Sequence, residues 1–438
     1  MNLLIKESIR NKQLGGGHLM KLKKVVLFTS CMFFSLLVKA GTDAVNLPST
    51  KSANLKSKSA VVISSASNLV DTGLTLEKGD VWVWGFRGSS QQGNGKSFEM
   101  SNSKPARVKY FANKGLSITQ LTAGTYHIIA LDEKGNVWGW GQNGYHEASG
   151  NNCAGNYPSS PVLVLNKKNV VMISAGEYSS YALTKSGDVY TWGHGIYGQI
   201  GNGKKDAVNN VNKLPRQYFN NRPVVLIGDG DNTGYAINNA GEVFGWGYDS
   251  ATLLFQAKPK KITNLPRGVN GKDIVHITGG DRFTAFLTSS GDVYGMGEGI
   301  YLGLNITKSG EKVTKPRRII RNINALSCQF MGCVAIDKNK RLWTWGVADG
   351  SNLIRIPLYG RTPTRRNHIG NLTKIDMGKQ HLIYWNDKGQ AFGVGHGALH
   401  KFSQQTNVDV GWPGREIKFV VDEMKRVYGK KHIPGQGK

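Results

Sequence analysis

The chain has 438 residues, and its 56 lysines and arginines exceed its 29 aspartates and glutamates, so the net charge is +27. Glycine is abundant, with 56 residues, while proline contributes only 13, a balance that excludes a disordered chain and indicates many tight turns. A positive field of this size favours anionic partners: nucleic acid, acidic proteins or phosphate-bearing polymers. The alternative is an exported protein whose basic surface has no specific partner.

The N-terminal region has the pattern of an export signal. Residues 20–40 combine a lysine-rich start, the apolar run 25–38 and a small-residue cleavage site before Gly41. The apolar run is too short to span a bilayer, and no other long one follows. We therefore expect a secreted, periplasmic or cell-surface protein without a transmembrane segment after cleavage. We interpret 1–19 as an untranslated or dispensable extension and 41–59 as a flexible linker.

Seven segments that start 49 to 56 residues apart share one pattern. Each alternates large apolar residues and is bounded by glycine or a polar turn residue, which indicates a strand. They are 79–85, 135–141, 187–193, 241–247, 291–297, 340–346 and 389–395.

Two further signatures accompany this strand. An Ala-Gly turn or its equivalent comes about eleven residues earlier and indicates a second and a third strand that meet closely. A proline follows each closing glycine, and because proline cannot donate to a β-ladder, it indicates an edge strand. Four strands in each of seven units predict an all-β fold, a single seven-bladed β-propeller over residues 60–421.

The two ends of the repeat suggest how the ring closes. The first unit has an inner strand at 60–67 without a preceding proline strand, and 412–421 supplies a surplus proline strand at the other end. We expect these N- and C-terminal segments to pair and close the ring. The alternative is an amphipathic helix over 414–428. Residues 422–438 are expected to form a basic tail.

The repeat resembles that of the regulator-of-chromosome-condensation family over residues 60–421. Its most specific piece is GDVYTWGHGIYGQIGNG at 187–203, followed by proline and the Ala-Gly turn. The resemblance implies a seven-bladed propeller. It also implies an alternative function, in which the chain is an effector protein that catalyses guanine-nucleotide exchange on a small GTPase.

The sequence does not match the residue pattern of an enzyme or cofactor-binding motif. The stretch RGSSQQGNGKS at 87–97 looks like a phosphate loop, but Ser90 stands where that loop requires glycine, and Gly-Asn-Gly-Lys recurs in register at 193–205. Residues 229–242 resemble a calcium-binding loop, but Ala240 stands where that loop requires glutamate. We expect no catalytic residue, no cofactor and no metal, and we interpret His127 and His381 as structural residues of turns.

Two surfaces are candidates for partner binding. The first is formed by side chains at or beside the Ala-Gly turns, which we expect to bind a protein: Tyr126, Tyr178, Arg282, Phe283, Phe330 and His381. The second is formed by cations beside the prolines, which we expect on the rim: Lys260, Lys261, Arg317, Arg318, Arg365 and Arg366. The alternatives are that the turns plug the central channel and that the cations protect the edge strands.

These observations predict a non-enzymatic, exported bacterial interaction protein: an adhesin, an inhibitor or a secreted virulence-type factor. Its partner is expected to be a protein or an anionic cell-surface polymer, with nucleic acid as a further possibility, and the chain itself is expected to be a monomer. The recurring tryptophans are predicted to fill space between blades. Cys328 and Cys333 either pair across a turn or remain as buried thiols.

Overall fold

The structure of the protein is a computed structural model of the whole chain. It describes residues 59–64, 72–77, 79–85, 90–96, 102–151, 155–249, 254–347, 360–367, 370–378, 381–395 and 410–416. The chain divides into two units, 1–44 and 45–438, and every described residue belongs to the second. The predicted extension, signal peptide, linker and basic tail lie outside the described residues.

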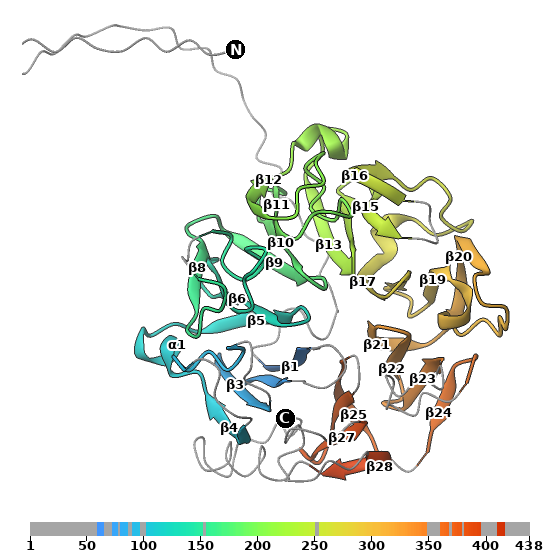
Figure 1. Cartoon of the computed structure of the whole chain (residues 1–438). Helices are drawn as coiled ribbons and strands as arrows, with labels where there is room; N and C mark the ends of the chain where they lie inside the picture. The colour runs from blue at the N-terminus through green and yellow to red at the C-terminus, as the bar shows by residue number, and fades with distance from the viewer. Residues whose placement is uncertain are drawn as a thin grey trace, which may run out of the picture. The chain divides into compact units, whose positions relative to one another are not determined.

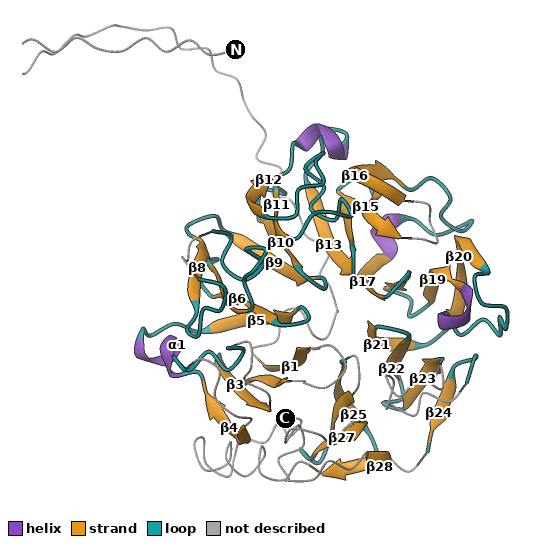
Figure 2. Ribbon diagram, in the orientation of Figure 1, coloured by secondary structure: helices purple, strands orange, loops and turns teal. Residues whose placement is uncertain are grey.

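The described residues form seven four-stranded antiparallel sheets, and each sheet takes its four strands in chain order. Figure 2 shows how strands dominate the structure. The first sheet comprises β1 Ser59–Ser64, β2 Thr72–Glu77, β3 Asp80–Gly85 and β4 Asn102–Arg107. The second comprises β5 Ile118–Ala123, β6 His127–Asp132, β7 Val137–Gly141 and β8 Val162–Leu165. The third comprises β9 Val170–Ala175, β10 Ser179–Thr184, β11 Val189–Gly193 and β12 Asn209–Lys213. The fourth sheet comprises β13 Val224–Gly230, β14 Thr233–Asn238, β15 Val243–Asp249 and β16 Leu254–Lys261. The fifth comprises β17 Ile274–Gly280, β18 Phe283–Thr288, β19 Val293–Glu298 and β20 Lys312–Ile320. The sixth comprises β21 Ile323–Gln329, β22 Gly332–Asp337, β23 Leu342–Gly346 and β24 Thr364–Arg366, and the seventh comprises β25 Leu372–Met377, β26 His381–Asn386, β27 Ala391–Gly395 and β28 Val410–Glu416.

Within the described residues, four short helical segments lie in the connections. They are the α-helix α1 Lys109–Asn113 and the 3-10 helices Arg216–Phe219, Gly271–Asp273 and Gly299–Tyr301.

The sheets are arranged as the blades of a propeller. The first strand of each sheet contacts the first strand of the next, from β1 through β5, β9, β13, β17 and β21 to β25, and β25 returns to β1 (Figure 1). The all-β propeller with four-stranded blades, predicted from the sequence, is confirmed.

The predicted mode of closure is wrong. β28, which contains Pro413, pairs with β27 inside the last sheet and not with the N-terminal sheet. Each sheet starts with its inner strand and ends with its outer strand, and a proline lies in that outer strand or within two residues of it, so among the described residues neither end has a strand in surplus. The ring closes instead through the contact between β1 and β25. Within 410–416 the chain forms a strand, and the rest of the alternative helix lies outside the described residues.

The tryptophans fill the space between blades, as predicted. Six of the eight recurring tryptophans are at most 2% exposed: Trp82, Trp84, Trp140, Trp192, Trp246 and Trp345. Trp138 is 7% exposed, Trp343 is half-buried, and Trp385, outside this set, is fully buried. Because each sheet packs against a neighbour on both sides, its second strand is buried throughout, as in β6, β10 and β14.

The antiparallel order gives the propeller two faces. The turns between first and second strands, together with the loops between third and fourth strands, lie at one end of every sheet, which we call the turn face. The turns between second and third strands and the connections between sheets lie at the other end, the opposite face. Backbone bonds join neighbouring blades there, for example from Val170 N to Gly135 O at 3.1 Å and from Val224 N to Gly187 O at 3.1 Å.

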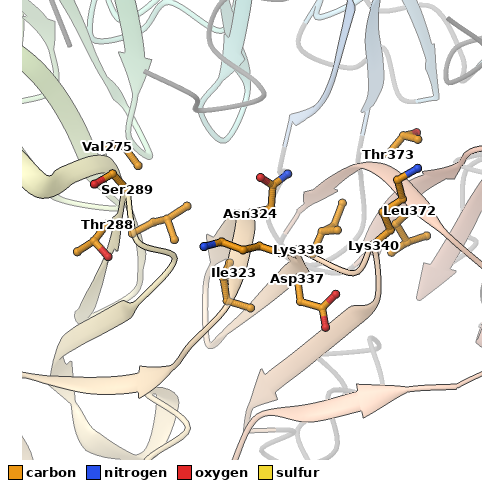
Figure 3. A pocket seen from close by; sticks show the side chains of 12 residues that line it. Val275, Thr288, Ser289, Ile323, Asn324, Asp337, Lys338, Lys340, Leu372 and Thr373 are labelled. Carbon is orange, nitrogen blue, oxygen red and sulfur yellow. The ribbon is translucent and has the colours of Figure 1, made fainter. Parts of the chain in front are cut away.

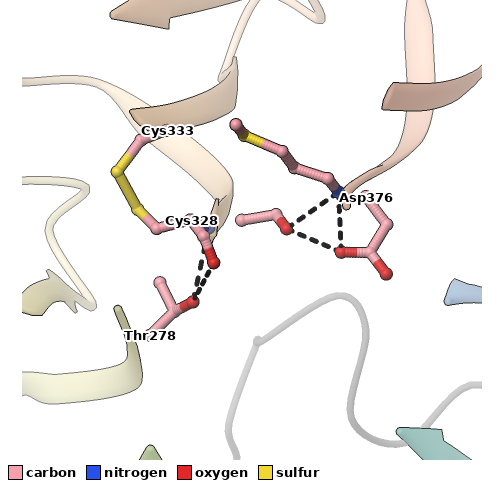
Figure 4. Close-up of a disulfide and its surroundings, with 6 residues drawn as sticks. Thr278, Cys328, Cys333 and Asp376 are labelled. Atoms are coloured by element: carbon pink, nitrogen blue, oxygen red, sulfur yellow. Dashed lines mark hydrogen bonds between the residues drawn. A yellow bond between two sulfur atoms is a disulfide. The ribbon is translucent and has the colours of Figure 1, made fainter. Parts of the chain in front are cut away.

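A disulfide joins Cys328 and Cys333, which settles the alternative that the sequence left open. The two residues face each other across the hairpin of β21 and β22 (Figure 4). The same figure shows how inner strands are linked: Thr278 Oγ1 donates to Cys328 O at 3.2 Å, and Ser327 Oγ donates to Asp376 Oδ1 at 2.6 Å.

Candidate functional site

The turns of the turn face follow one another around the inner end of the blades. Thr125 N donates to Glu177 O at 2.9 Å, Glu177 N donates to Asp231 O at 2.9 Å, and Asp281 N donates to Phe330 O at 2.7 Å. Backbone hydrogen bonds therefore join the turns of the second, third and fourth blades, and those of the fifth and sixth, to one another.

Aromatic side chains cross this surface in a row. Tyr126 and Tyr178, both predicted, are half-buried at equivalent turns, and their ring centroids are 6.5 Å apart. Tyr145 meets Tyr178 at 5.7 Å and His194 at 4.2 Å. We define the aromatic row by its six members: Tyr126, Tyr178, Tyr145, His194, Tyr197 and Tyr248.

The outer end of the row is its most exposed part. Tyr197 lies 6.1 Å from His194 and 5.7 Å from Tyr248, and the two tyrosines are 38% and 40% exposed. Ile196, next in the chain, is 39% exposed. Large apolar side chains that stay this exposed on a folded surface, and that touch one another, are typical of interaction sites.

The loop after β7 and the loop after β11 hold their tyrosines in the same way. Tyr145 N donates to Glu147 Oε2 at 2.7 Å, and Tyr197 N donates to Gln199 Oε1 at 3.0 Å. Neither Tyr145 nor Tyr197 was predicted from the sequence. The available signal was a tyrosine two positions before the recurring glutamine or glutamate.

A pocket of about 350 Å³ opens beside Tyr197 and Tyr248. Its polar wall comes from successive turns of the third, fourth and fifth blades, and its lining residues include Glu177, Asp231, Asn232, Asp281 and Arg282. The lining therefore includes two exposed tyrosines, the buried Phe283, three carboxylates and one guanidinium, a mixture suited to a peptide surface with both apolar and charged groups.

Arg282 and Phe330 occupy the turns of the fifth and sixth blades at positive φ, 75° and 52°. The Arg282 side chain is 55% exposed, and its Nε lies 3.6 Å from Asp281 Oδ2. Phe330 is half-buried. The structure thus places four of the predicted residues on the turn face: Tyr126, Tyr178, Arg282 and Phe330.

The other two predicted anchors are buried and do not offer a surface. Phe283 and His381 are each 1% exposed, and the Phe283 ring packs 6.0 Å from that of Tyr301. Each is the first residue of a second strand, β18 or β26, and second strands are enclosed by the neighbouring blades. Proximity to a turn was therefore a poor guide to exposure.

His127 has a structural role in the packing of two blades. It is fully buried, and its Nε2 lies 2.9 Å from Ser180 Oγ, which in turn donates to Glu147 O at 2.9 Å. Burial lowers the pKa of His127 to about 3, so the ring is neutral at ordinary pH.

The predicted rim cations lie on outer strands, in three successive sheets: Lys260 and Lys261 on β16, Arg317 and Arg318 on β20, and Arg365 and Arg366 on β24. Several are held by neighbouring side chains. Lys261 pairs with Glu242 at 2.7 Å, and Arg366 Nε donates to Thr344 Oγ1 at 2.9 Å. Part of the rim charge is thus engaged within the protein.

Among the described residues, no group of three histidine, cysteine, aspartate or glutamate side chains is arranged to hold a metal ion. No helix in that part of the chain has the length and apolar character needed to cross a membrane.

The profile of the RCC1-like domain matches residues 36–354 of this chain. Among similar proteins, the mitochondrial RCC1 domain-containing protein RUG3 of Arabidopsis thaliana is 28% identical over 189 residues, which cover 42% of this chain and 41% of RUG3. The E3 ubiquitin-protein ligase HERC2 of Homo sapiens is 27% identical over 297 residues, 64% of this chain but 6% of HERC2. The chain thus matches less than half the length of either relative. The ultraviolet-B receptor UVR8 of Arabidopsis thaliana is 23% identical over 379 residues, 81% of each chain.

Solved structures show the same fold at lower sequence identity. Yeast RCC1 (Prp20) bound to Kap60 superimposes with a TM-score of 0.65 at 18% identity, covering 89% of this chain and 91% of that one. Human WBSCR16 gives a TM-score of 0.61 at 18% identity, with coverage of 76% and 93%.

Proposed function

The chain belongs to the RCC1-like domain family, and we propose that it is a non-enzymatic interaction protein that binds a partner protein through the turn face. The contact is centred on the exposed outer end of the aromatic row and on the pocket beside it. Export from the cytoplasm is part of the proposal, and the signal-peptide pattern of residues 20–40 supports it.

The observation that carries this proposal is the pair Tyr197 and Tyr248. Their rings touch at 5.7 Å, both are exposed by more than a third, and both line the pocket. Tyrosine is enriched at the energetic centres of protein interfaces because it buries a large apolar ring and keeps a hydroxyl for hydrogen bonding. Because the backbone N–H of Tyr197 is held by Gln199 Oε1, the loop that carries this tyrosine loses little conformational freedom when a partner docks.

The polar wall of the pocket supplies specificity in this proposal. Arg282 stands beside Asp281, and Glu177 and Asp231 lie on the preceding turns. A partner that presents a cationic side chain to the carboxylates and a carboxylate to Arg282 would match both signs of charge. The role as an adhesin, inhibitor or secreted virulence-type factor depends on which protein carries that surface.

The experiment combines localisation and capture. The full chain is expressed in its own cell, its location is determined by fractionation, and its partner is recovered by cross-linking and affinity purification. We expect the double variant Tyr197→Ala, Tyr248→Ala to lose the recovered partner. The matched control is Tyr157→Ala, which removes another exposed tyrosine outside the row. Equal recovery by the double variant would refute the turn-face proposal, and retention in the cytoplasm would refute export.

A second candidate is guanine-nucleotide exchange on a small GTPase. The structure of Prp20p from Saccharomyces cerevisiae, described with its binding properties to Gsp1p and histones, superimposes with a TM-score of 0.65 at 19% identity, covering 81% of this chain and 87% of that one. At this identity the likeness is one of fold. Release of labelled guanine nucleotide from purified small GTPases separates the candidates: accelerated release supports exchange, and binding of a partner without it supports the first proposal.

A further inference from the structure

The opposite face carries a set of cations that the proposed function does not use. Lys134 and Lys185 lie on the turns between second and third strands of the second and third blades. The others lie on connections between consecutive blades, and all six are exposed. We call the set the basic face: Lys134, Lys167, Lys168, Lys185, Arg222 and Lys272.

Backbone contacts place these residues at one end of the blades. Lys167 N donates to Asn136 Oδ1 at 2.9 Å, so the connection after β8 lies against the turn that carries Lys134. Lys185 N donates to Asn169 O at 2.9 Å, which joins the next turn to the same connection. The cations are therefore carried by adjoining loops of successive blades, all at the end away from the aromatic row.

The carboxylates nearby are used within the protein. Asp132 accepts backbone N–H groups from Lys134 and Asn136, each at 2.9 Å, while Asp188 pairs with Arg216 at 2.8 Å. None of the six cations of the basic face forms an ion pair with any described residue. Glu133, exposed beside Lys134, and Asp273, exposed beside Lys272, offset two of the six charges, and the remaining four are available to a partner.

A pocket of about 730 Å³ extends the positive character of this face to the fifth, sixth and seventh blades. Lys338 and Lys340 line it (Figure 3), and Lys338 Nζ donates to Ser290 O at 2.7 Å. Its one lining carboxylate, Asp337, accepts Arg341 Nε at 2.6 Å and Trp343 Nε1 at 3.0 Å. The walls combine five aliphatic side chains with hydroxyl, amide and ammonium groups, and the two lysines give the pocket its positive charge.

We propose that the basic face docks on a bilayer surface rich in anionic phospholipid, leaving the turn face free to bind its partner. The cations are spread over several loops at one end of the blades, which matches a plane of charge. Five of the six are lysines, compact point charges without the fork or stacking plane of arginine. The large exposed hydrophobic residues of the described chain all lie in or beside connections between third and fourth strands, on the turn face, so an electrostatic contact is what the basic face offers.

Binding of the full chain to vesicles tests the proposal. Vesicles of phosphatidylcholine alone are compared with vesicles containing about one third phosphatidylglycerol, at low and high salt. We expect binding to the anionic vesicles only, and weaker binding as salt rises. Binding to both kinds of vesicle, or to neither, would overturn the proposal.

Two variants with equal loss of charge locate the contact. The face variant replaces four lysines with glutamine: Lys134, Lys167, Lys168 and Lys185. The control variant replaces four exposed cations of the outer strands β16 and β20 with glutamine: Lys260, Lys312, Lys315 and Arg317. All eight positions are exposed, and a thermal melt confirms that both variants fold.

We expect the face variant to lose affinity for anionic vesicles on the order of a hundredfold, because each lysine near such a surface contributes separately. The control should lose less than about threefold. Equal losses in the two variants would show a contact governed by net charge alone and would overturn the assignment to this face. Duplex DNA is the competing probe: tighter binding to DNA than to anionic vesicles, lost in the face variant, would assign the face to nucleic acid and overturn the proposal.

Discussion

The indole Nε1 of Trp192 donates a 2.9 Å hydrogen bond to the backbone carbonyl of Glu147, in the loop of the preceding blade. The same bond recurs between Trp140 and Gln91 O at 2.7 Å and between Trp246 and Gln199 O at 2.8 Å. The repeated tryptophan therefore joins each of these blades to its neighbour, in addition to filling the space between them. Gln91 belongs to the stretch 87–97, so the part of the chain that looks like a phosphate loop helps to join blades.

Replacing Trp192 by phenylalanine removes this bond and leaves a small cavity. Ser180 Oγ still donates to the Glu147 carbonyl, so the acceptor keeps one partner. We expect the free energy of unfolding to fall by about 2 kcal/mol. Chemical denaturation measures it, and Tyr190→Phe, a half-buried position on the same strand, serves as the control. A loss as small as that of the control would contradict the joining role.

Glu147 makes the stability of the protein depend on pH. Its side chain is buried, burial raises its pKa from 4.5 to about 7, and its Oε1 has no hydrogen-bond partner among the described residues. A carboxyl whose pKa is raised by folding stabilises the folded state when protonated, so this contribution is present below pH 4.5 and is lost as the pH rises through 7.

Glutamine occupies the equivalent position 199, so Glu147→Gln should remove that loss. We expect the variant to gain about 2 kcal/mol over the wild type at pH 8 and to match it near pH 4. Denaturant titrations across this range measure the difference. If the difference in the free energy of unfolding between the variant and the wild type does not change with pH, Glu147 stays protonated or finds other partners.

Gly139 lies where two parts of the second blade approach closely. A Cβ at this position would lie 1.8 Å from Ala148 O, which is a backbone atom, whereas a Cβ at Gly144 would meet nothing within 4 Å. We expect Gly139→Ala to destabilise the fold by more than about 3 kcal/mol and Gly144→Ala to change it by less than about 1 kcal/mol. The thermal midpoints of the two variants should differ accordingly, and equal midpoints would contradict the packing of this loop.

The disulfide between Cys328 and Cys333 closes a short loop at the turn face. Alkylation before and after reduction should modify these two residues only after reduction, as read by mass spectrometry. Reduction should lower the free energy of unfolding by about 2 kcal/mol, because a short closed loop removes modest entropy from the unfolded chain. Alkylation of both without reduction would show that the pair is absent.

The repeat allowed much of the fold to be predicted, because strand, turn and tryptophan recur at nearly fixed spacing. Proline marked outer strands correctly at Pro105, Pro259, Pro316 and Pro413. Closure was predicted wrongly because the repeat itself does not show where a blade begins. Reading the unit from its inner strand removes the surplus strand that Pro413 seemed to create.

The site was harder to predict than the fold. Phe283 and His381 follow turns, yet they enter strands that neighbouring blades enclose. The contacts of Tyr145, Tyr197 and Tyr248 depend on loops from consecutive blades. A single sequence does not show which residues of different loops lie side by side. The state of Cys328 and Cys333 required the register of one hairpin, in which the two residues are directly paired.

In the proposed function, a partner protein docks on the turn face at the outer end of the aromatic row. Photo-cross-linking in the producing cell tests it most directly, with a photoreactive residue at position 197 on the turn face, at 260 on an outer strand or at 185 on the opposite face. We predict one protein adduct of defined mass from position 197 and none of that mass from 260 or 185. The same adduct from 260 or 185, with none from 197, would contradict the proposed function.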